Sequence, residues 1–87
     1  MYEIVFMKKA QKDLKLLHQK PAMMKNVFAL VELIKRDPYQ NPPPFEELMG
    51  DLAGVFSRRL NRKDRIVYTI DDECKIIYVH RVRGHYE

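Results

Sequence analysis

The proline block in the middle of the chain constrains the fold more than any other sequence feature. Asp37-Pro38 is followed closely by Asn41-Pro42-Pro43-Pro44. Proline disfavours helical backbone at the preceding residue and cannot continue a helix interior or a central strand. The block therefore predicts an extended, polyproline-like connector that ends the helical region before it. Apolar residues recur at helical spacing before the block and alternate after it, so the connector is interpreted as internal and not as a domain boundary.

The half before the prolines predicts a strand and then two helices. Residues 2–7 alternate in β-branched and aromatic side chains, which is typical of a short strand. Residues 8–19 have apolar side chains at helical spacing and Asp13 among the polar positions, which indicates an amphipathic helix. Because Pro21 is tolerated only in a first turn, a second helix is predicted over residues 21–36. The two helices are expected to form an antiparallel hairpin.

The half after the prolines predicts three strands joined by charged turns. The strands are expected at residues 55–60, 65–70 and 75–82, and the turns at residues 61–64 and 71–73. Close succession favours an antiparallel meander. The predicted fold class is α+β with the order β-α-α-β-β-β, in which the helical hairpin packs on one face of a small, mainly antiparallel sheet. A length of 87 residues suits one domain, so residues 1–87 are assigned to a single domain.

Composition favours an acidic partner and a reducing compartment. Sixteen Lys and Arg against twelve Asp and Glu leave a formal net charge of +4, which suits RNA or an acidic protein. Cys74 is the only cysteine, so it predicts neither an intramolecular disulfide nor a cysteine-based zinc site. The first residues do not resemble a signal peptide, and no apolar run reaches the roughly 18 residues of a membrane span. A cytoplasmic protein without a membrane partner is expected.

Acid–base side chains and arginines in the second half are the residue types that RNA cleavage requires. Internal transesterification needs a base for the 2′-hydroxyl proton, cations for the phosphorane-like transition state and an acid for the 5′-oxygen. Glu46 or its neighbour Glu47 is a candidate base, Arg65 a candidate cation and His85 a candidate acid. The structural alternatives are a solvated loop or helix-start carboxylate for Glu46, a cross-strand salt bridge for Arg65 and a frayed terminus for His85.

Other chemistries have less support in the sequence. The three glycines form no phosphate-binding loop, and the three histidines lack zinc-like spacing. Metal-free acid–base catalysis without a cofactor is therefore preferred. His80 alternates with apolar residues in a predicted strand and is expected to be packed or paired. Arg58 and Arg59 should lie on opposite faces of their strand, so both cannot serve one site.

Several motifs together resemble the YoeB (Txe/YoeB) toxins of the RelE superfamily. They are the stretch from Gly54 through Ser57-Arg58-Arg59, then Arg65-Ile66-Val67-Tyr68, and the terminal His85-Tyr86. The resemblance spans essentially the whole chain and is strongest from Glu46 onward. It implies a RelE-like β-α-α-β-β-β domain and an mRNA interferase from a type II toxin–antitoxin module, which cleaves mRNA on the ribosome and inhibits translation.

The resemblance also implies roles for individual residues. Glu46 would be the base, Arg65 would stabilise the phosphate, His85 would be the acid, and Tyr86 would orient the substrate. RNA contacts are expected from the arginines of this half, with Arg59 preferred and Arg58 alternatively a rim or packing residue; the full set is Arg58, Arg59, Arg81 and Arg83.

The partners implied by the resemblance are mRNA in the ribosomal A site, the ribosome and a YefM/Phd-like antitoxin. A homodimer is also expected, and operator DNA only indirectly, through the antitoxin complex. A catalytically inactive RelE-like module that binds RNA or protein is the alternative function.

This sequence departs from the family pattern near both ends of the candidate site. Met49 and Gly50 stand where basic or polar residues are expected, and Phe56 replaces an expected tryptophan. Glu87 adds negative charge beside His85, which favours the imidazolium form and would raise the pKa of His85.

Overall fold

The computed structural model describes residues 1–82 and confirms the predicted order of elements, with one additional strand. The elements are β1 (Glu3–Phe6), α1 (Lys8–Leu17), α2 (Pro21–Arg36), β2 (Phe45–Glu47), the 3-10 turn η1 (Gly50–Leu52), β3 (Val55–Arg59), β4 (Arg65–Asp71) and β5 (Ile76–Arg81). The bounds of the four predicted strands agree within one residue at each end. Helix α1 ends at Leu17, two residues earlier than predicted, where its carbonyl accepts from the Lys20 amide at 2.8 Å.

The strands form one mixed sheet of five strands in the order β1-β5-β4-β3-β2. β1 pairs with β5 in parallel, and the other three pairings are antiparallel. The predicted meander therefore forms the centre of the sheet, and β1 joins one edge after the helical hairpin. The register between β4 and β5 shifts between Val67 and Tyr68.

Strand β2 was not predicted, and it changes the environment of Glu46. Glu46 lies in an edge strand paired with β3 rather than in a loop or at a helix start. The Leu48 amide extends the pairing by donating to the Val55 carbonyl at 2.8 Å. Three residues are too few to show alternation in a sequence. This strand depends on its partner β3 and has no clear signal of its own.

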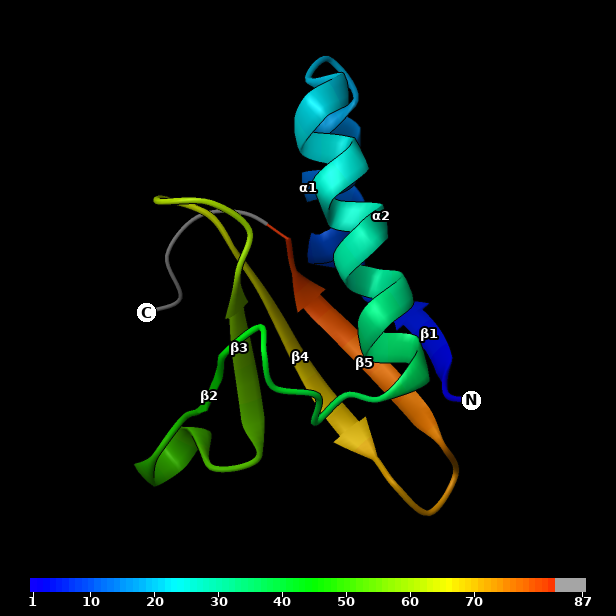
Figure 1. Ribbon diagram of the computed structural model, residues 1–87, viewed down its shortest axis with the longest axis vertical. Helices are drawn as coiled ribbons and strands as arrows, with labels where there is room; N and C mark the ends of the chain where they lie inside the picture. Colours follow the sequence, from blue (N-terminus) through cyan, green and yellow to red (C-terminus); the bar gives the residue numbers. More distant parts are fainter. Residues whose placement is uncertain (83–87) are drawn as a thin grey trace.

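Both helices lie at the β1–β5 side of the sheet, and β2 and β3 form its other side (Figure 1). Pro21 occupies the first turn of α2, as expected. Apolar residues from both helices and from β3, β4 and β5 form one buried cluster, whose fully or nearly buried members include Ala10, Val27, Ile34, Phe56, Ile66, Tyr68, Ile77 and Val79. No helix in residues 1–82 is long and apolar enough to cross a membrane.

The connector between α2 and β2 is attached to the sheet by its tyrosine. The Tyr39 hydroxyl donates to Asp72 in the β4–β5 turn at 2.6 Å, and Tyr2 donates to the other oxygen of the same carboxylate at 2.5 Å. The Tyr39 ring also meets Phe56 edge-on at 5.9 Å. The hydrogen bond to Asp72 raises the pKa of Tyr39 to about 12. These contacts fix the beginning of the connector against the hairpin that carries Asp72.

Candidate active site

Three neighbouring strands bring Glu46, Ser57, Arg59 and Arg65 together. In register, Glu46 lies opposite Ser57 and Arg59 lies opposite Arg65. The four side chains line a small hollow of about 60 Å³, together with Pro44 and Phe45. Residues far apart in the sequence therefore form one concave, charged surface.

This surface lies on the face of the sheet that is turned away from the helices. Ile66 and Tyr68 alternate with Arg65 on β4, and both are completely buried in the core. Because successive side chains of a strand point to opposite faces, Arg65 points away from that core. The same alternation on β3 separates Phe56, in the core, from Ser57. The face of the sheet without helices therefore holds the predicted base and the predicted cation.

Glu46 and Arg65 form a loose ion pair at the hollow. Arg65 Nη2 lies 3.9 Å from Glu46 Oε1, and the side chains are 22% exposed for Arg65 and 66% exposed for Glu46. Arg65 Nη1 donates to Ser57 Oγ at 3.0 Å, which orients the guanidinium. Exposed pairs contribute only about 0–1 kcal/mol to folding. The salt bridge that was the structural alternative for Arg65 is present, but it is too long and too exposed to hold both groups tightly.

The structure distinguishes the two neighbouring glutamates. Glu46 lies opposite Ser57, whereas Glu47 lies opposite Phe56, whose ring is in the core. Glu47 is also close enough to the Tyr39 hydroxyl for its charge to raise the pKa of Tyr39. Glu46 is therefore the glutamate that shares a face with Arg65.

The turn between β2 and β3 contains both glycines that precede the Ser-Arg-Arg motif. Gly54 has φ 89° and Gly50 has φ 68°, a left-handed backbone that favours glycine. Met49, one of the departures from the family pattern, is 85% exposed beside this turn. The side chain that replaces a basic or polar residue therefore lies at the surface near Glu46.

Arg58 is buried and lies on the opposite side of the sheet from Arg59. Its side chain is 1% exposed and donates to Tyr68 Oη, to the Pro43 carbonyl and to the Pro38 carbonyl. The predicted separation of Arg58 and Arg59 on opposite faces is confirmed. The prediction that Arg58 contacts RNA is corrected, because its guanidinium is enclosed by protein; it is a packing residue.

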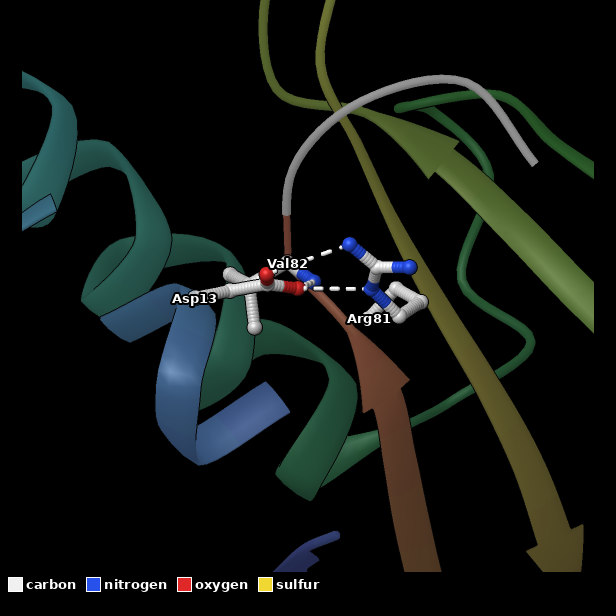
Figure 2. Close-up of polar contacts among 3 residues, drawn as sticks. All are labelled: Asp13, Arg81 and Val82. Carbon is white, nitrogen blue, oxygen red and sulfur yellow. Dashed lines mark hydrogen bonds and ion pairs between the residues drawn. The ribbon is translucent and has the colours of Figure 1, made fainter. Parts of the chain in front are cut away.

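Arg81 forms an ion pair with Asp13 of helix α1 (Figure 2). Its Nε donates to Asp13 Oδ2 at 2.8 Å, and the Val82 amide donates to the same oxygen at 3.1 Å. The bond to Asp13 raises the pKa of Arg81. Asp13, which sequence periodicity assigned to the polar surface, is buried. Arg81 is 40% exposed, and its predicted RNA contact stays a prediction.

His80 is paired, as the sequence predicted. Its Nε2 lies 2.9 Å from Thr69 Oγ1, the hydroxyl of a β4 residue that alternates with core residues. Burial lowers the pKa of His80, which favours the neutral imidazole. The predicted acid His85, Tyr86, the RNA-contact candidate Arg83 and Glu87 lie outside the described residues 1–82. Within residues 1–82, no group of three or more His, Cys, Asp and Glu side chains could hold a metal ion.

Comparison with known proteins decides the family. Residues 6–86 match the YoeB-like toxins of bacterial type II toxin-antitoxin systems. The chain is 38% identical to a toxin YoeB of Synechocystis over 65 residues, which cover 75% of this chain and 73% of that one. It is 30% identical to the Escherichia coli K12 toxin YoeB over 64 residues, 74% of each chain. The chain belongs to the YoeB-like toxins.

Solved structures of YoeB-like toxins share the fold. The YoeB/ParE toxin from Agrobacterium tumefaciens superposes with a TM-score of 0.88 at 28% identity, covering 97% of this chain and 99% of that one. YoeB in a YoeB-YefM complex from Staphylococcus aureus gives 0.83 at 32% identity, with 99% of each chain covered. The helical hairpin on a mixed five-stranded sheet is therefore the YoeB-like architecture.

Sequence analysis missed one polar neighbour in this YoeB-like site. Ser57 was noted only as part of the Ser-Arg-Arg motif, yet it binds Arg65 directly. The available signal was its spacing from Arg59, because two residues that are two positions apart on a strand point to the same face of the sheet. Strand β2 gave no comparable signal, so the contact between Glu46 and β3 could not be anticipated.

Proposed function

We propose that this YoeB-like toxin is a ribosome-dependent endoribonuclease that cleaves mRNA by metal-free acid–base transesterification and so inhibits translation. The observation that carries the proposal is the Glu46–Arg65 pair, 3.9 Å apart at a hollow on the exposed face of the sheet. A carboxylate that is 66% exposed is open to substrate. Its weak pairing leaves it available to accept a proton.

In the proposed reaction, Glu46 takes the proton of a ribose 2′-hydroxyl. The 2′-oxygen forms a bond to phosphorus while the bond from phosphorus to the 5′-oxygen breaks. Arg65, oriented by Ser57, stabilises the negative charge that develops on the phosphorane oxygens. The products are a 2′,3′-cyclic phosphate, or its hydrolysis product, and a free 5′-hydroxyl.

His85 is the proposed acid for the departing 5′-oxygen, and Tyr86 is proposed to orient the substrate. The sequence places His85 three residues after Val82. Val82 lies at the end of the sheet that holds Arg65, because Arg81 pairs with Val67 in register. An imidazole has an ordinary pKa near 6.5 and can therefore donate a proton at about neutral pH. Arg59, Arg81 and Arg83 are the proposed RNA contacts.

The proposed partners follow from the net charge and from the family. A net charge of +4 suits mRNA and the ribosome, which present phosphates. The Staphylococcus aureus relative was solved in complex with YefM, and a YefM/Phd-like antitoxin is proposed here as well. A Staphylococcus aureus YoeB dimer has also been solved, so a homodimer is proposed. Operator DNA would be contacted through the antitoxin complex, and the proposed compartment is the cytoplasm.

The test is translation of a defined mRNA in a purified bacterial system, with mapping of new 5′ ends. Wild type is expected to cut within the translated region, and His85→Gln and Arg65→Ala to cut at least about 100-fold more slowly, the usual range for loss of an acid or of a charge-stabilising group. Omission of ribosomes should abolish cutting by wild type. Intact mRNA with wild type would favour the inactive binding module instead.

Arg36→Ala is the matched control for Arg65→Ala, because it removes the same charge at the other end of the molecule. Arg36 is exposed at the end of α2. The carbonyl of its neighbour Lys35 accepts a hydrogen bond from the Tyr2 amide, next to β1. β1 pairs with the start of β5, which lies opposite Asp71 at the end of β4, whereas Arg65 lies at the start of β4. Arg36→Ala should cut like wild type. Equal losses in both variants would mean that charge in general, and not Arg65, supports the reaction.

A further inference from the structure

The position of Glu46 depends on a short edge strand. β2 has three residues and lies at the edge of the sheet. An edge strand of this length is paired on one side only and forms few ladder hydrogen bonds of its own. The proline connector leads directly into β2, so an incorrect path of the connector would displace Glu46. Contacts that fix the connector and the start of β2 are therefore needed to hold Glu46 near Arg65.

Beside the contacts of Tyr39 described above, one buried side chain contacts both ends of the connector and the start of β2. Arg58 Nη2 donates to the Pro38 carbonyl at 3.0 Å, near the beginning of the connector, and Nη1 donates to the Pro43 carbonyl at 2.6 Å, near its end. Arg58 Nε donates to Tyr68 Oη on β4 at 2.8 Å. The guanidinium carbon also lies 4.8 Å from the centre of the Phe45 ring, the first residue of β2. Arg58 thus joins β4, both ends of the connector and β2.

The chemistry of these contacts requires an arginine. The three oxygens belong to neutral groups, and the Phe45 ring provides a favourable face for a cation. A buried charge is costly unless its donors are satisfied. The planar guanidinium directs its donors along diverging fixed directions, whereas a lysine ammonium is a single point charge on a flexible stem. Lysine would keep the charge but could not hold all three oxygens in this arrangement.

We propose that Arg58 is a positioning residue that fixes the connector and β2 so that Glu46 faces Arg65; this role rests on the function proposed above. Arg58 does not touch the hollow, because it lies on the helix-side face with its guanidinium enclosed. It acts through the backbone of Phe45, with which it is paired in register, and through the two proline carbonyls. Substrate contacts remain with Glu46 and Arg65.

Hydrogen exchange tests the structural half of this proposal independently of cleavage. In Arg58→Lys, the Leu48 amide, which donates to the Val55 carbonyl of β3, is expected to exchange about tenfold faster or more, because local opening of β2 becomes easier. Amides of α2 are expected to keep the wild-type rates. Arg59→Lys, the same change at the adjacent exposed residue, is the matched control and should leave the Leu48 amide protected. Wild-type protection of the Leu48 amide in Arg58→Lys would overturn the proposal.

Kinetics on programmed ribosomes test the functional half. A misplaced base lowers the rate of the chemical step, so Arg58→Lys should lower kcat by about 10–100-fold and change KM by less than about threefold. In a Glu46→Gln background the same substitution should cause little further loss, since its effect is transmitted through Glu46. A purely structural defect would instead lower kcat by the same factor in both backgrounds, which would overturn the positioning role.

The outcomes separate this proposal from the proposed function. If wild type does not cut, or Glu46→Gln cuts as fast as wild type, the proposed function fails and the role of Arg58 fails with it. If Glu46→Gln is impaired but Arg58→Lys cuts like wild type, only the role of Arg58 fails. Tyr68→Phe keeps Arg58 and its bonds to both proline carbonyls; it removes one of the three acceptors of Arg58, together with the bond that the Tyr68 hydroxyl itself donates to the Pro38 carbonyl at 3.3 Å. It should therefore lower kcat in the same direction but less than Arg58→Lys, and a larger loss would contradict the proposal.

Discussion

Glu46 and Glu47 are chemically identical neighbours whose side chains lie on opposite faces of the sheet. Glu46 lies opposite Ser57 and near Arg65, and Glu47 lies opposite the core residue Phe56. We therefore expect Glu46→Gln to lower the rate of mRNA cleavage by about 10²–10⁴-fold, the usual contribution of a general base, and Glu47→Gln to change it by less than about threefold. Single-turnover cleavage on programmed ribosomes measures both, with each variant serving as the control for the other. A greater loss in Glu47→Gln would assign the base to Glu47.

His80 is a residue whose protonation should oppose folding. Burial lowers the pKa of His80 below its ordinary value of 6.5. Around and below pH 6.5 the unfolded chain therefore binds more protons at this position than the folded protein, and stability falls as the pH falls through that range. His80→Gln removes this contribution, so its loss of stability between pH 7 and pH 5 should be smaller than that of wild type. Urea unfolding at both pH values measures the difference, and identical pH dependence would show that His80 does not contribute.

At the scale of elements, Asp13 fastens α1 to the end of β5. The buried carboxylate accepts from Arg81 and from the Val82 amide (Figure 2). Asp13→Ala should lower the free energy of unfolding by about 2 kcal/mol, the usual contribution of hydrogen bonds to a charged group. This loss is smaller than that for breaking a fully buried ion pair, because the Arg81 side chain is 40% exposed. Urea denaturation with an unchanged m-value measures the loss. Asp51→Ala, at an exposed position, is the control, and an equally small effect in both variants would contradict the assignment.

Elements with their own periodicity could be predicted from the sequence, and elements that depend on a partner could not. The helices and the four longer strands carry alternation or helical spacing, and their positions were predicted closely. Strand β2 has three residues and forms by pairing with β3. Helical spacing assigned Asp13 to the surface, because nothing local reveals that Arg81, distant in sequence, will meet it.

The same limit applies to the candidate site. Alternation placed Arg58 and Arg59 on opposite faces, and this relation holds in the structure. The choice between Glu46 and Glu47 needed the register of β2, which only the folded sheet provides. The burial of Arg58 was unpredictable for the same reason, since its acceptors at Pro38 and Pro43 lie in a connector without periodicity.

At the scale of the whole molecule, packing and proposed chemistry occupy different faces of one sheet. The helices and the apolar cluster cover one face, and Glu46, Ser57 and Arg65 lie on the other. Arg58, with its contacts to the Pro38 and Pro43 carbonyls, stabilises the packed side rather than the open one. Substitutions that change proposed substrate contacts can therefore be separated from those that change stability, because they lie on different surfaces.

The distribution of charge makes a final prediction about RNA binding. The net charge is +4, and Arg59 is an exposed cation at the hollow beside Arg65. For a single-stranded RNA with 2′-O-methyl groups, which lacks the hydroxyl proton needed for cleavage, the logarithm of the association constant should fall linearly with the logarithm of salt concentration. Arg59→Ala should reduce that slope by about 0.7, the value for one lost phosphate contact on a single strand, while Arg36→Ala at the other end should leave it unchanged. Fluorescence anisotropy titrations from 50 to about 300 mM salt measure the slopes, and equal slopes for Arg59→Ala and wild type would exclude Arg59 from the RNA-binding surface.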